Sequence, residues 1–313
     1  MSDTEVHLTS AALPAVSQVV EHVAPGGEVP PLDLGAMAGA VRPHLTIRPS
    51  SGWAAINVVE LWQFRDLLFG LAGRDLKLRY KQTALGVIWV VLQPLMAAGI
   101  FSFVFGKVAK MESDGVPYFV FAYAGLLGWN LFNNTVTKAS SCLIGNAQLI
   151  SKVFFPRLIL PLSTVPSVMI DFAVAAGMLA VMMAFHRTLP PATLLLLPVW
   201  MALLLMLSLG LGLITASLTV SYRDVQYILP VFLQILLYAS PIAYPVSKVP
   251  TNLRTVYYLN PLTAPLEAFR SSLLGTSMPY WHQILYAAAV SLAVFLVGVY
   301  SFKRMERKFA DVI

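Results

Sequence analysis

A search for residues that could hydrolyse a nucleotide finds only a fragment of the required motif. The phosphate-binding loop of many nucleotide hydrolases reads G-x-x-x-x-G-K-[ST], because its glycines let backbone N–H groups surround the phosphates. Here Gly106 and Lys107 are followed by Val108, and the upstream glycine is absent. The chain therefore has no ATP-hydrolysing loop of this type, and an ATP-driven process would need a second protein.

Metal ligands and reactive thiols are equally sparse. The five histidines are scattered along the chain, and no H-E-x-x-H pattern occurs. The only cysteine, Cys142, excludes an intrachain disulfide and a cysteine-based zinc cluster. We expect this thiol to pack as a small apolar side chain. The sequence thus predicts no metal site, no cofactor bound by this chain and no catalytic residue.

One carboxylate, Asp171, interrupts the apolar stretch from Leu158 to His186. Ionisable groups inside a membrane are costly and often mark ion or proton pathways. A single acid without a basic partner in the membrane is nevertheless a poor proton relay. We therefore favour a packing role, in which Asp171 bonds to neighbouring hydroxyl or basic groups.

The elements that must position these residues have the composition of a membrane protein. Of 313 residues, 58% are hydrophobic and only 12% are charged, whereas soluble domains carry about 25% charged residues. The net charge of +6 would suggest a nucleic-acid ligand in a soluble protein. Here the charges lie at the ends of apolar runs, which indicates orientation in a membrane and no nucleic-acid partner.

Uncharged stretches predict an all-α membrane protein with six transmembrane helices, since a hydrocarbon core takes roughly 20 helical residues to cross. The spans lie within a transmembrane domain at 83–302, at about 83–106, 115–140, 158–186, 191–220, 226–243 and 281–302. Basic residues near the span ends number twelve on one side and six on the other. The side richer in basic residues is cytoplasmic in membrane proteins, so we expect both termini there.

The two ends of the chain are predicted to lie outside the membrane. Residues 1–50 are rich in Pro, Gly and Ala without a lasting period, which predicts a mostly disordered cytoplasmic tail. Residues 303–313 follow the last span and form a cytoplasmic C-terminus.

Two further segments are neither spans nor plain loops. Residues 57–81 place Leu61, Phe64, Leu68 and Leu71 on one helical face, which predicts an amphipathic helix in the cytoplasmic interface. Residues 244–280 are broken by four prolines, yet are too apolar for an exposed loop. Short re-entrant helices, buried against protein before the sixth span, would fit this pattern.

Aromatic side chains are frequent in the predicted spans. Most should face lipid or the membrane interface, as aromatic belts do. Sugar rings also stack on aromatic faces, so some of these residues could line a glycan conduit. The candidates are Trp89, Phe105, Trp129 and Tyr238.

Four separated motifs resemble the permease subunits of type-2 ABC exporters, in particular those for O-antigen, capsule and teichoic acid. They are "ELWQFRDLLFGLAGRDLKLRYKQTALGVIWVVLQPL" (60–95), "LISKVFFPRLILPL" (149–162), "SYRDVQYILPVFLQ" (221–234) and "YLNPLTAPLEAFRSSLLG" (258–275). The resemblance implies a permease that exports lipid-linked polysaccharide across the bacterial inner membrane. It also implies a second copy of the chain and two ATP-binding subunits, which hold the ATP and Mg.

The same resemblance assigns roles to individual segments. Residues 144–156, in "IGNAQLISKVFFPRLILP", would form a cytoplasmic coupling helix between spans two and three, and residues 244–280 an outer gate segment. The implied contacts to the ATPase subunit are Gly145, Asn146, Leu149, Ile150 and Lys152, with Leu61, Arg65, Arg74 and Lys77 in the interfacial helix. The implied gate residues are Asn260, Glu267 and Arg270.

Other interpretations stay open on sequence alone. A related exporter of drugs or small lipids would share the architecture. A membrane-embedded glycan-modifying transferase would need acid–base groups, and Asp171 and Asp224 have no evident partner constellation. Glu267 and Arg270, three residues apart, could also form an ordinary helical ion pair.

Overall fold

The computed structural model describes residues 4–5, 48–49, 58–81 and 86–312. The chain divides into two units, 1–57 and 58–313. In the first, the two-residue strands β1 (Thr4–Glu5) and β2 (Arg48–Pro49) pair in antiparallel fashion. The remainder of the predicted 1–50 tail lies outside the described residues.

The described secondary structure of the second unit consists of helices joined by loops. Its α-helices are α3 (Val58–Gln63), α4 (Arg65–Lys81), α5 (Gly86–Phe101), α6 (Tyr118–Gly145), α7 (Ala147–Lys152), α8 (Ile159–Phe185), α9 (Leu197–Ser221), α10 (Val225–Tyr238), α11 (Thr251–Tyr258), α12 (Thr263–Leu274) and α13 (Trp281–Val312). The π-helix η1 (Ser102–Val108) and the 3₁₀-helices η2 (Ala192–Leu196) and η3 (Val246–Lys248) complete the set.

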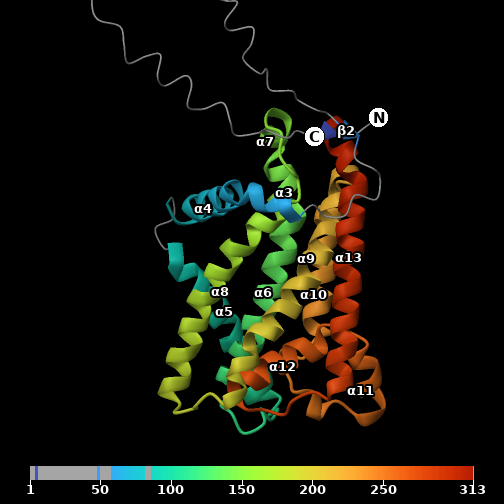
Figure 1. The fold of residues 1–313 in the computed structure, drawn as a ribbon. Coiled ribbons are helices and arrows are strands. Elements are labelled where there is room, and N and C mark those ends of the chain that lie inside the picture. The colour runs from blue at the N-terminus through green and yellow to red at the C-terminus, as the bar shows by residue number, and fades with distance from the viewer. Residues whose placement is uncertain (1–3, 6–47, 50–57, 82–85, 313) are drawn as a thin grey trace, which may run out of the picture. The chain divides into compact units, whose positions relative to one another are not determined.

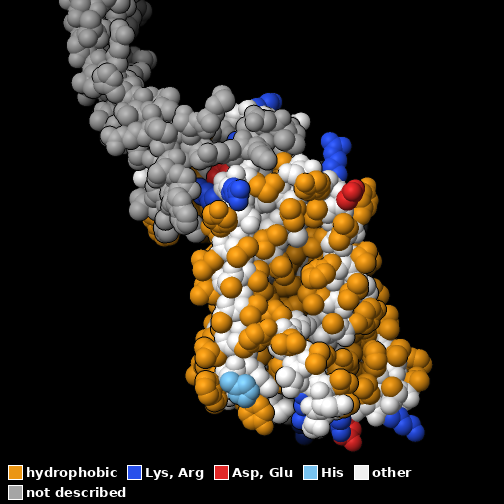
Figure 2. Space-filling view, turned by 90° about the vertical axis from the view of Figure 1, so that its right-hand side faces the viewer, with side chains coloured by type: hydrophobic (Ala, Val, Ile, Leu, Met, Phe, Trp, Pro, Cys, Tyr) orange, Lys and Arg blue, Asp and Glu red, His pale blue; other side chains and the backbone are white. Residues whose placement is uncertain are grey.

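Four of these helical segments are long and apolar enough to cross a membrane. They are Ile88–Val108, Ile159–Phe185, Ala192–Ser221 and Trp281–Glu306. The second predicted span corresponds to α6, whose 28 residues include polar side chains such as Asn133 and Asn134. The fifth corresponds to α10, which has only 14 residues. Figure 2 shows hydrophobic side chains over the side wall of the helical unit and charged side chains toward its two ends.

The core lies around α6, which packs between α8 and α9, while α13 covers α9 (Figure 1). Close approach of α9 and α13 depends on two glycines. A Cβ at Gly298 would lie 2.4 Å from the Gly210 carbonyl oxygen, so a larger residue would force these helices apart. Small residues at such crossings are typical of membrane helices, whose association depends on close packing.

The predicted helix at 57–81 is two helices, because a turn at Phe64 separates α3 from α4. In Figure 1, α4 lies across one end of the upright helices. Leu71 is buried on this helix, whereas Arg74 and Lys77 are exposed. Its covered face therefore includes one member of the predicted apolar stripe, and its basic residues lie outside the packing interface.

The broken segment at 244–280 contains η3, α11 and α12 at the opposite end from α4 (Figure 1). All twelve residues of α12 are buried, and they pack against α6 and α9. The helix ends at Gly275, where φ is 73°, a left-handed conformation that glycine adopts without steric cost. This segment thus includes one short interior helix, α12, whereas α11 has no buried residue.

Candidate functional site

The segment predicted to couple the chain to an ATPase begins where Asn146 interrupts a helix. Asn146 has φ −120° and ψ 24°, and it separates α6 from the six-residue helix α7. Its backbone oxygen accepts hydrogen bonds from the amides of Leu149 and Ile150, at 3.0 and 3.1 Å. Its side-chain Nδ2 donates to the Cys142 carbonyl at 2.8 Å. One residue therefore ends α6, starts α7 and ties the two together.

The predicted contact residues on α7 differ in exposure. Ile150 is buried, at 9% exposure, and Leu149 is half-buried. Gly145 and Lys152 are exposed, and Lys152 lies in the last turn of α7, where a cation complements the helix dipole. The exposed side of α7 is therefore basic, while Ile150 anchors the helix to the chain.

The structure joins α7 to α4 through two of the predicted residues. Nη2 of Arg74 donates to Asn146 Oδ1 at 2.7 Å and to Asp75 Oδ1 at 2.8 Å. The aspartate holds the guanidinium in position, and a charge-assisted hydrogen bond of this kind is stronger than one between neutral groups. A second predicted residue, Arg65, lies 5.3 Å from the ring of Trp62 and does not take part.

A further connection joins the loop between α7 and α8 to the C-terminal part of α13. The Arg157 amide donates to Glu306 Oε1 at 3.2 Å, and its guanidinium Nη1 donates to the Glu306 carbonyl oxygen. Lys303 lies 3.3 Å from the same glutamate. The α7 region is therefore attached to α4 on one side and to α13 on the other.

Beneath these contacts, Asp171 of α8 meets Lys138 of α6. Nζ of Lys138 lies 3.2 Å from Asp171 Oδ2 and 3.1 Å from the Ser167 hydroxyl. The sequence identified no basic partner for Asp171, but the neighbouring helix α6 supplies Lys138. The packing role, with bonds to hydroxyl or basic groups, fits this geometry. A cavity of about 360 Å³ is lined by Lys138, and its lining also includes Arg74 and Asn146.

The predicted gate residues occupy the other end of the molecule. Asn260 donates from Nδ2 to the Ala239 carbonyl and to Ser240 Oγ, at 3.2 and 3.0 Å. Its Oδ1 accepts a 3.0 Å bond from the Leu262 amide, just before α12 begins. Asn260 therefore joins the end of α10 to the start of α12.

Glu267 and Arg270 take separate partners and do not form the helical ion pair left open above. Tyr258 donates a 2.6 Å hydrogen bond to Glu267 Oε2. Burial raises the pKa of the Glu267 carboxyl above its ordinary value, while this hydrogen bond acts in the opposite direction. Glu267 therefore links α11 to α12 within an interior site.

Arg270 is almost fully buried, at 1% exposure. Its Nη1 donates to the Pro241 carbonyl at 2.6 Å, and its guanidinium carbon lies 4.0 Å from the centre of the Phe121 ring. Burial lowers its pKa to about 10, so it remains charged at neutral pH. The charge holds α12 to the chain after α10 and to α6.

The four conduit candidates occupy different surroundings. Trp89 and Tyr238 are exposed, at 49% and 60%, and Phe105 is half-buried against Phe101. Trp129 is buried at 5% exposure. The structure does not gather these four side chains into one site.

The sequence prediction missed Lys138 and Tyr258, which bond to Asp171 and Glu267, and it missed Glu306, which bonds to Arg157. Lys138 had been counted only as a basic residue near the end of a span, and Glu306 had been given no role. The polar residues near Asp171 could have raised the question of a partner, but their spacing does not say which helix lies next to it. Among the described residues, no group of three His, Cys, Asp or Glu side chains could hold a metal.

Comparison with known proteins covers most of the chain. Residues 66–274 match the family described as ABC-2 type transporter. The chain is 29% identical over 258 residues to the O-antigen export system permease protein RfbA of Myxococcus xanthus, covering 82% of this chain and 98% of that protein. It is 28% identical over 254 residues to the protein of the same name from Klebsiella pneumoniae, covering 79% and 95%. Identity to the polysialic acid transport protein KpsM of Escherichia coli is 22% over 238 residues, covering 74% and 91%.

Proposed function

This chain belongs to the ABC-2 type transporter family, and we propose on that basis that it is the permease of an ATP-driven exporter of lipid-linked polysaccharide. The observation that carries the proposal is the similarity to O-antigen export permeases over 95–98% of their length. The substrate would be an O-antigen or capsule type of glycan. This chain would supply the membrane pathway, while a separate ABC subunit would bind and hydrolyse ATP with Mg.

The proposed membrane domain has six spans, with α6 and α10 added to the four apolar ones. At 1.5 Å per residue, the 28 residues of α6 extend about 42 Å, which exceeds a hydrocarbon core of about 30 Å. Its polar residues are compatible with a span because most of the helix is buried among other helices. The 14 residues of α10 extend only about 21 Å, and the buried chain at 240–243 would complete this span.

The proposed ATPase contact is the surface around α7, comprising Gly145, Asn146, Leu149, Ile150 and Lys152. The interfacial residues Leu61, Arg65, Arg74 and Lys77 would lie beside it. Support comes from the Arg74–Asn146 hydrogen bond, which joins the two parts of this surface. In this proposal the α7 end and both termini would face the cytoplasm, and the chain would lie in the bacterial inner membrane.

The proposed mechanism transmits force without chemistry in this chain. Closure of two ATPase subunits around ATP would push α7. The push would reach α6 through the chain, α4 through Arg74, and α13 through Arg157. ATP would thereby favour one arrangement of the helices over another, which is a population shift.

A second copy of the chain would complete the conduit. Exposed aromatic residues, including Trp89 and Tyr238, would face either lipid or the glycan between the two copies. At the opposite end from α7, α11 and α12 would form the gate, with Asn260, Glu267 and Arg270 as the residues that connect it to the rest of the chain. Their hydrogen bonds to the end of α10, to α11 and to the loop after α10 support a gate that moves as a rigid body.

The decisive experiment is co-purification with an ATP-binding subunit, followed by substitution on α7. We expect the double variant Lys152→Glu, Ile150→Ala to lose both stimulation of ATP hydrolysis and export, while remaining in the membrane. The matched control is Lys107→Glu, which makes the same charge change on an exposed residue at the end of η1. Full ATPase stimulation and export in the double variant would refute the coupling assignment.

The substrate needs its own test, because an exporter of drugs or small lipids would pass the previous one. A strain that lacks this chain should accumulate a lipid-linked glycan on the cytoplasmic face. Restoring the chain should clear that intermediate. If the glycan appears on the cell surface in normal amount without the chain, the polysaccharide assignment is wrong.

A further inference from the structure

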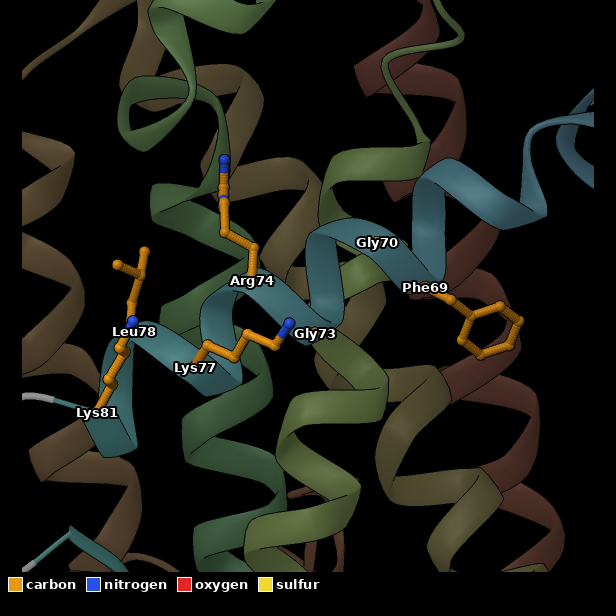
Figure 3. A pocket seen from close by; sticks show the side chains of 7 residues that line it. All are labelled: Phe69, Gly70, Gly73, Arg74, Lys77, Leu78 and Lys81. Carbon is orange, nitrogen blue, oxygen red and sulfur yellow. The ribbon is translucent and has the colours of Figure 1, made fainter.

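A basic groove runs along the exposed face of α4. Its volume is about 550 Å³, and its lining is Phe69, Gly70, Gly73, Arg74, Lys77, Leu78 and Lys81. Within the described residues, this lining has three cations and no carboxylate. Figure 3 shows the groove on one side of the helix, with Lys77 extended along it toward Gly73.

The spacing of these residues explains the groove. Gly70, Gly73, Lys77 and Lys81 follow one another at intervals of three or four residues, so they lie along one face of the helix. Nothing lies within 4 Å of a Cβ added at Gly70 or at Gly73. The two glycines therefore leave an unoccupied space beside the lysines, with room for a group larger than water.

Apolar side chains flank the cations. Phe69 is 63% exposed and Leu78 is 61% exposed. The two point to different sides of α4 in Figure 3, with Leu78 on the side of Arg74. A large exposed apolar group next to lysines is typical of a helix at a membrane surface, where the apolar group enters the acyl region and the charges stay at the headgroups, and Phe69 has this position. In Figure 1, α4 lies across the ends of the upright helices, as such a helix should.

Arg74 lines the groove, but its hydrogen bonds are made with residues outside the groove lining. Arg74 is bonded to Asp75 and Asn146, and its side chain points away from Lys77 in Figure 3. Lys77 and Lys81 are exposed and project beside the groove. The two lysines therefore provide the binding charge, while Arg74 connects the site to α7.

We propose that this groove binds the phosphate headgroup of an acidic glycerophospholipid of the cytoplasmic leaflet, with its acyl chains beside Phe69. The proposal rests on the membrane orientation of the proposed function. A bound lipid would hold α4 at the membrane surface and so maintain the Arg74–Asn146 contact. The lipid would thus be a positive regulator of coupling, not a substrate.

Binding is measured on the complete complex with its ATPase subunit, in detergent, by titration with phosphatidylglycerol and with phosphatidylcholine. We expect saturable binding of phosphatidylglycerol. Since each lysine near an acidic surface contributes enough to change affinity about fivefold, Lys77→Gln with Lys81→Gln should weaken binding about 25-fold. The control Lys107→Gln with Lys110→Gln removes two exposed lysines near η1 and should bind as wild type does.

A second variant tests the shape of the groove without changing its charge. Gly73→Leu should fill the unoccupied space beside the lysines. It should not destabilise the helix, because no atom lies near an added Cβ at Gly73 and Leu favours helix. We expect unchanged thermal stability and weaker phosphatidylglycerol binding. Unchanged binding in both the lysine and the glycine variant would overturn the proposal.

Three other results would also overturn it. Equal competition by inorganic phosphate would identify a free-anion site, and preference for a polyprenyl phosphate would identify a site for the substrate carrier. Loss of the ATPase subunit from the lysine variant, with lipid binding intact, would identify an ATPase surface. Failure of the wild-type complex to export glycan would instead refute the proposed function, whatever the lipid result.

Discussion

Removal of the Asp171 carboxylate should destabilise the helical bundle. Its Oδ2 atom lies 3.2 Å from Nζ of Lys138, and this contact joins α8 to α6. The Asp171 side chain is only 5% exposed, whereas that of Lys138 is 30% exposed. Asp171→Asn keeps the shape of the side chain but removes the charge that attracts the ammonium group.

The magnitude follows from these exposures. Breaking a fully buried ion pair by removal of one partner costs about 3–5 kcal/mol, because a charge is left behind. Water can reach the partly exposed Lys138, so we expect a smaller loss of about 2–3 kcal/mol. Replacing both residues by apolar ones, as Lys138→Met with Asp171→Leu, should restore stability to within about 1 kcal/mol of wild type.

Thermal unfolding of the purified complex, followed by tryptophan fluorescence, measures the effect. For a chain of this size, 1 kcal/mol corresponds to a change of about 2–4 °C in Tm, so Asp171→Asn should lower Tm by roughly 4–12 °C. The control is Asp224→Asn, since Asp224 is an exposed acid at the start of α10. The Tm of the Asp224→Asn variant should equal that of wild type.

Two results would refute this reasoning. An Asp171→Asn variant as stable as the control would show that the ion pair does not hold α6 to α8. A double variant that is stable but cannot export would show that Asp171 has a function beyond packing, such as proton transfer. Retained export in the stable double variant would establish the structural role.

Three further predictions concern other contacts. The pKa of Glu267 is raised in the folded chain, so above pH 4.5 the folded state binds more protons than the unfolded state. The free energy of unfolding should therefore fall as pH rises from 4.5 through the raised pKa. A melting series against pH should show this slope in wild type and a smaller one in Glu267→Gln. Gly298→Ala should cost about 1–3 kcal/mol, because its Cβ would meet the Gly210 carbonyl, and an unchanged Tm would contradict this packing. Glu306→Ala should reduce export per ATP hydrolysed without loss of the ATPase subunit, since it removes the side-chain bond to the Arg157 amide, and an unchanged ratio would exclude this role.

The sequence located helices well where long runs of uncharged residues occur. Four such runs correspond to helices apolar enough to span a membrane. It could not separate lipid-facing from interior residues, because hydropathy is the same in both places. Trp129 illustrates this limit: it was a candidate for the conduit wall, yet it is buried against Phe132 at 5.6 Å between ring centres.

Partnerships between helices were also beyond the sequence. Asp171 and Lys138 lie 33 residues apart, and nothing in their spacing indicates that α6 and α8 lie side by side. The same holds for Arg157 and Glu306, which are separated by 149 residues. The resemblance to exporters correctly named the family, but it did not predict the hydrogen bond between Arg74 and Asn146.

The position of α6 explains how a push at α7 could reach the proposed gate. This helix runs unbroken over 28 residues from Tyr118 to Gly145, directly before α7. In the half of α6 that begins at Tyr118, a Cβ at Gly128 would lie 3.1 Å from both Leu266 and Phe269 of α12. Close-packed interiors have low compressibility and transmit strain. We infer that α6 acts as a rigid connection, so that tilting it by force on α7 must also move or repack α12.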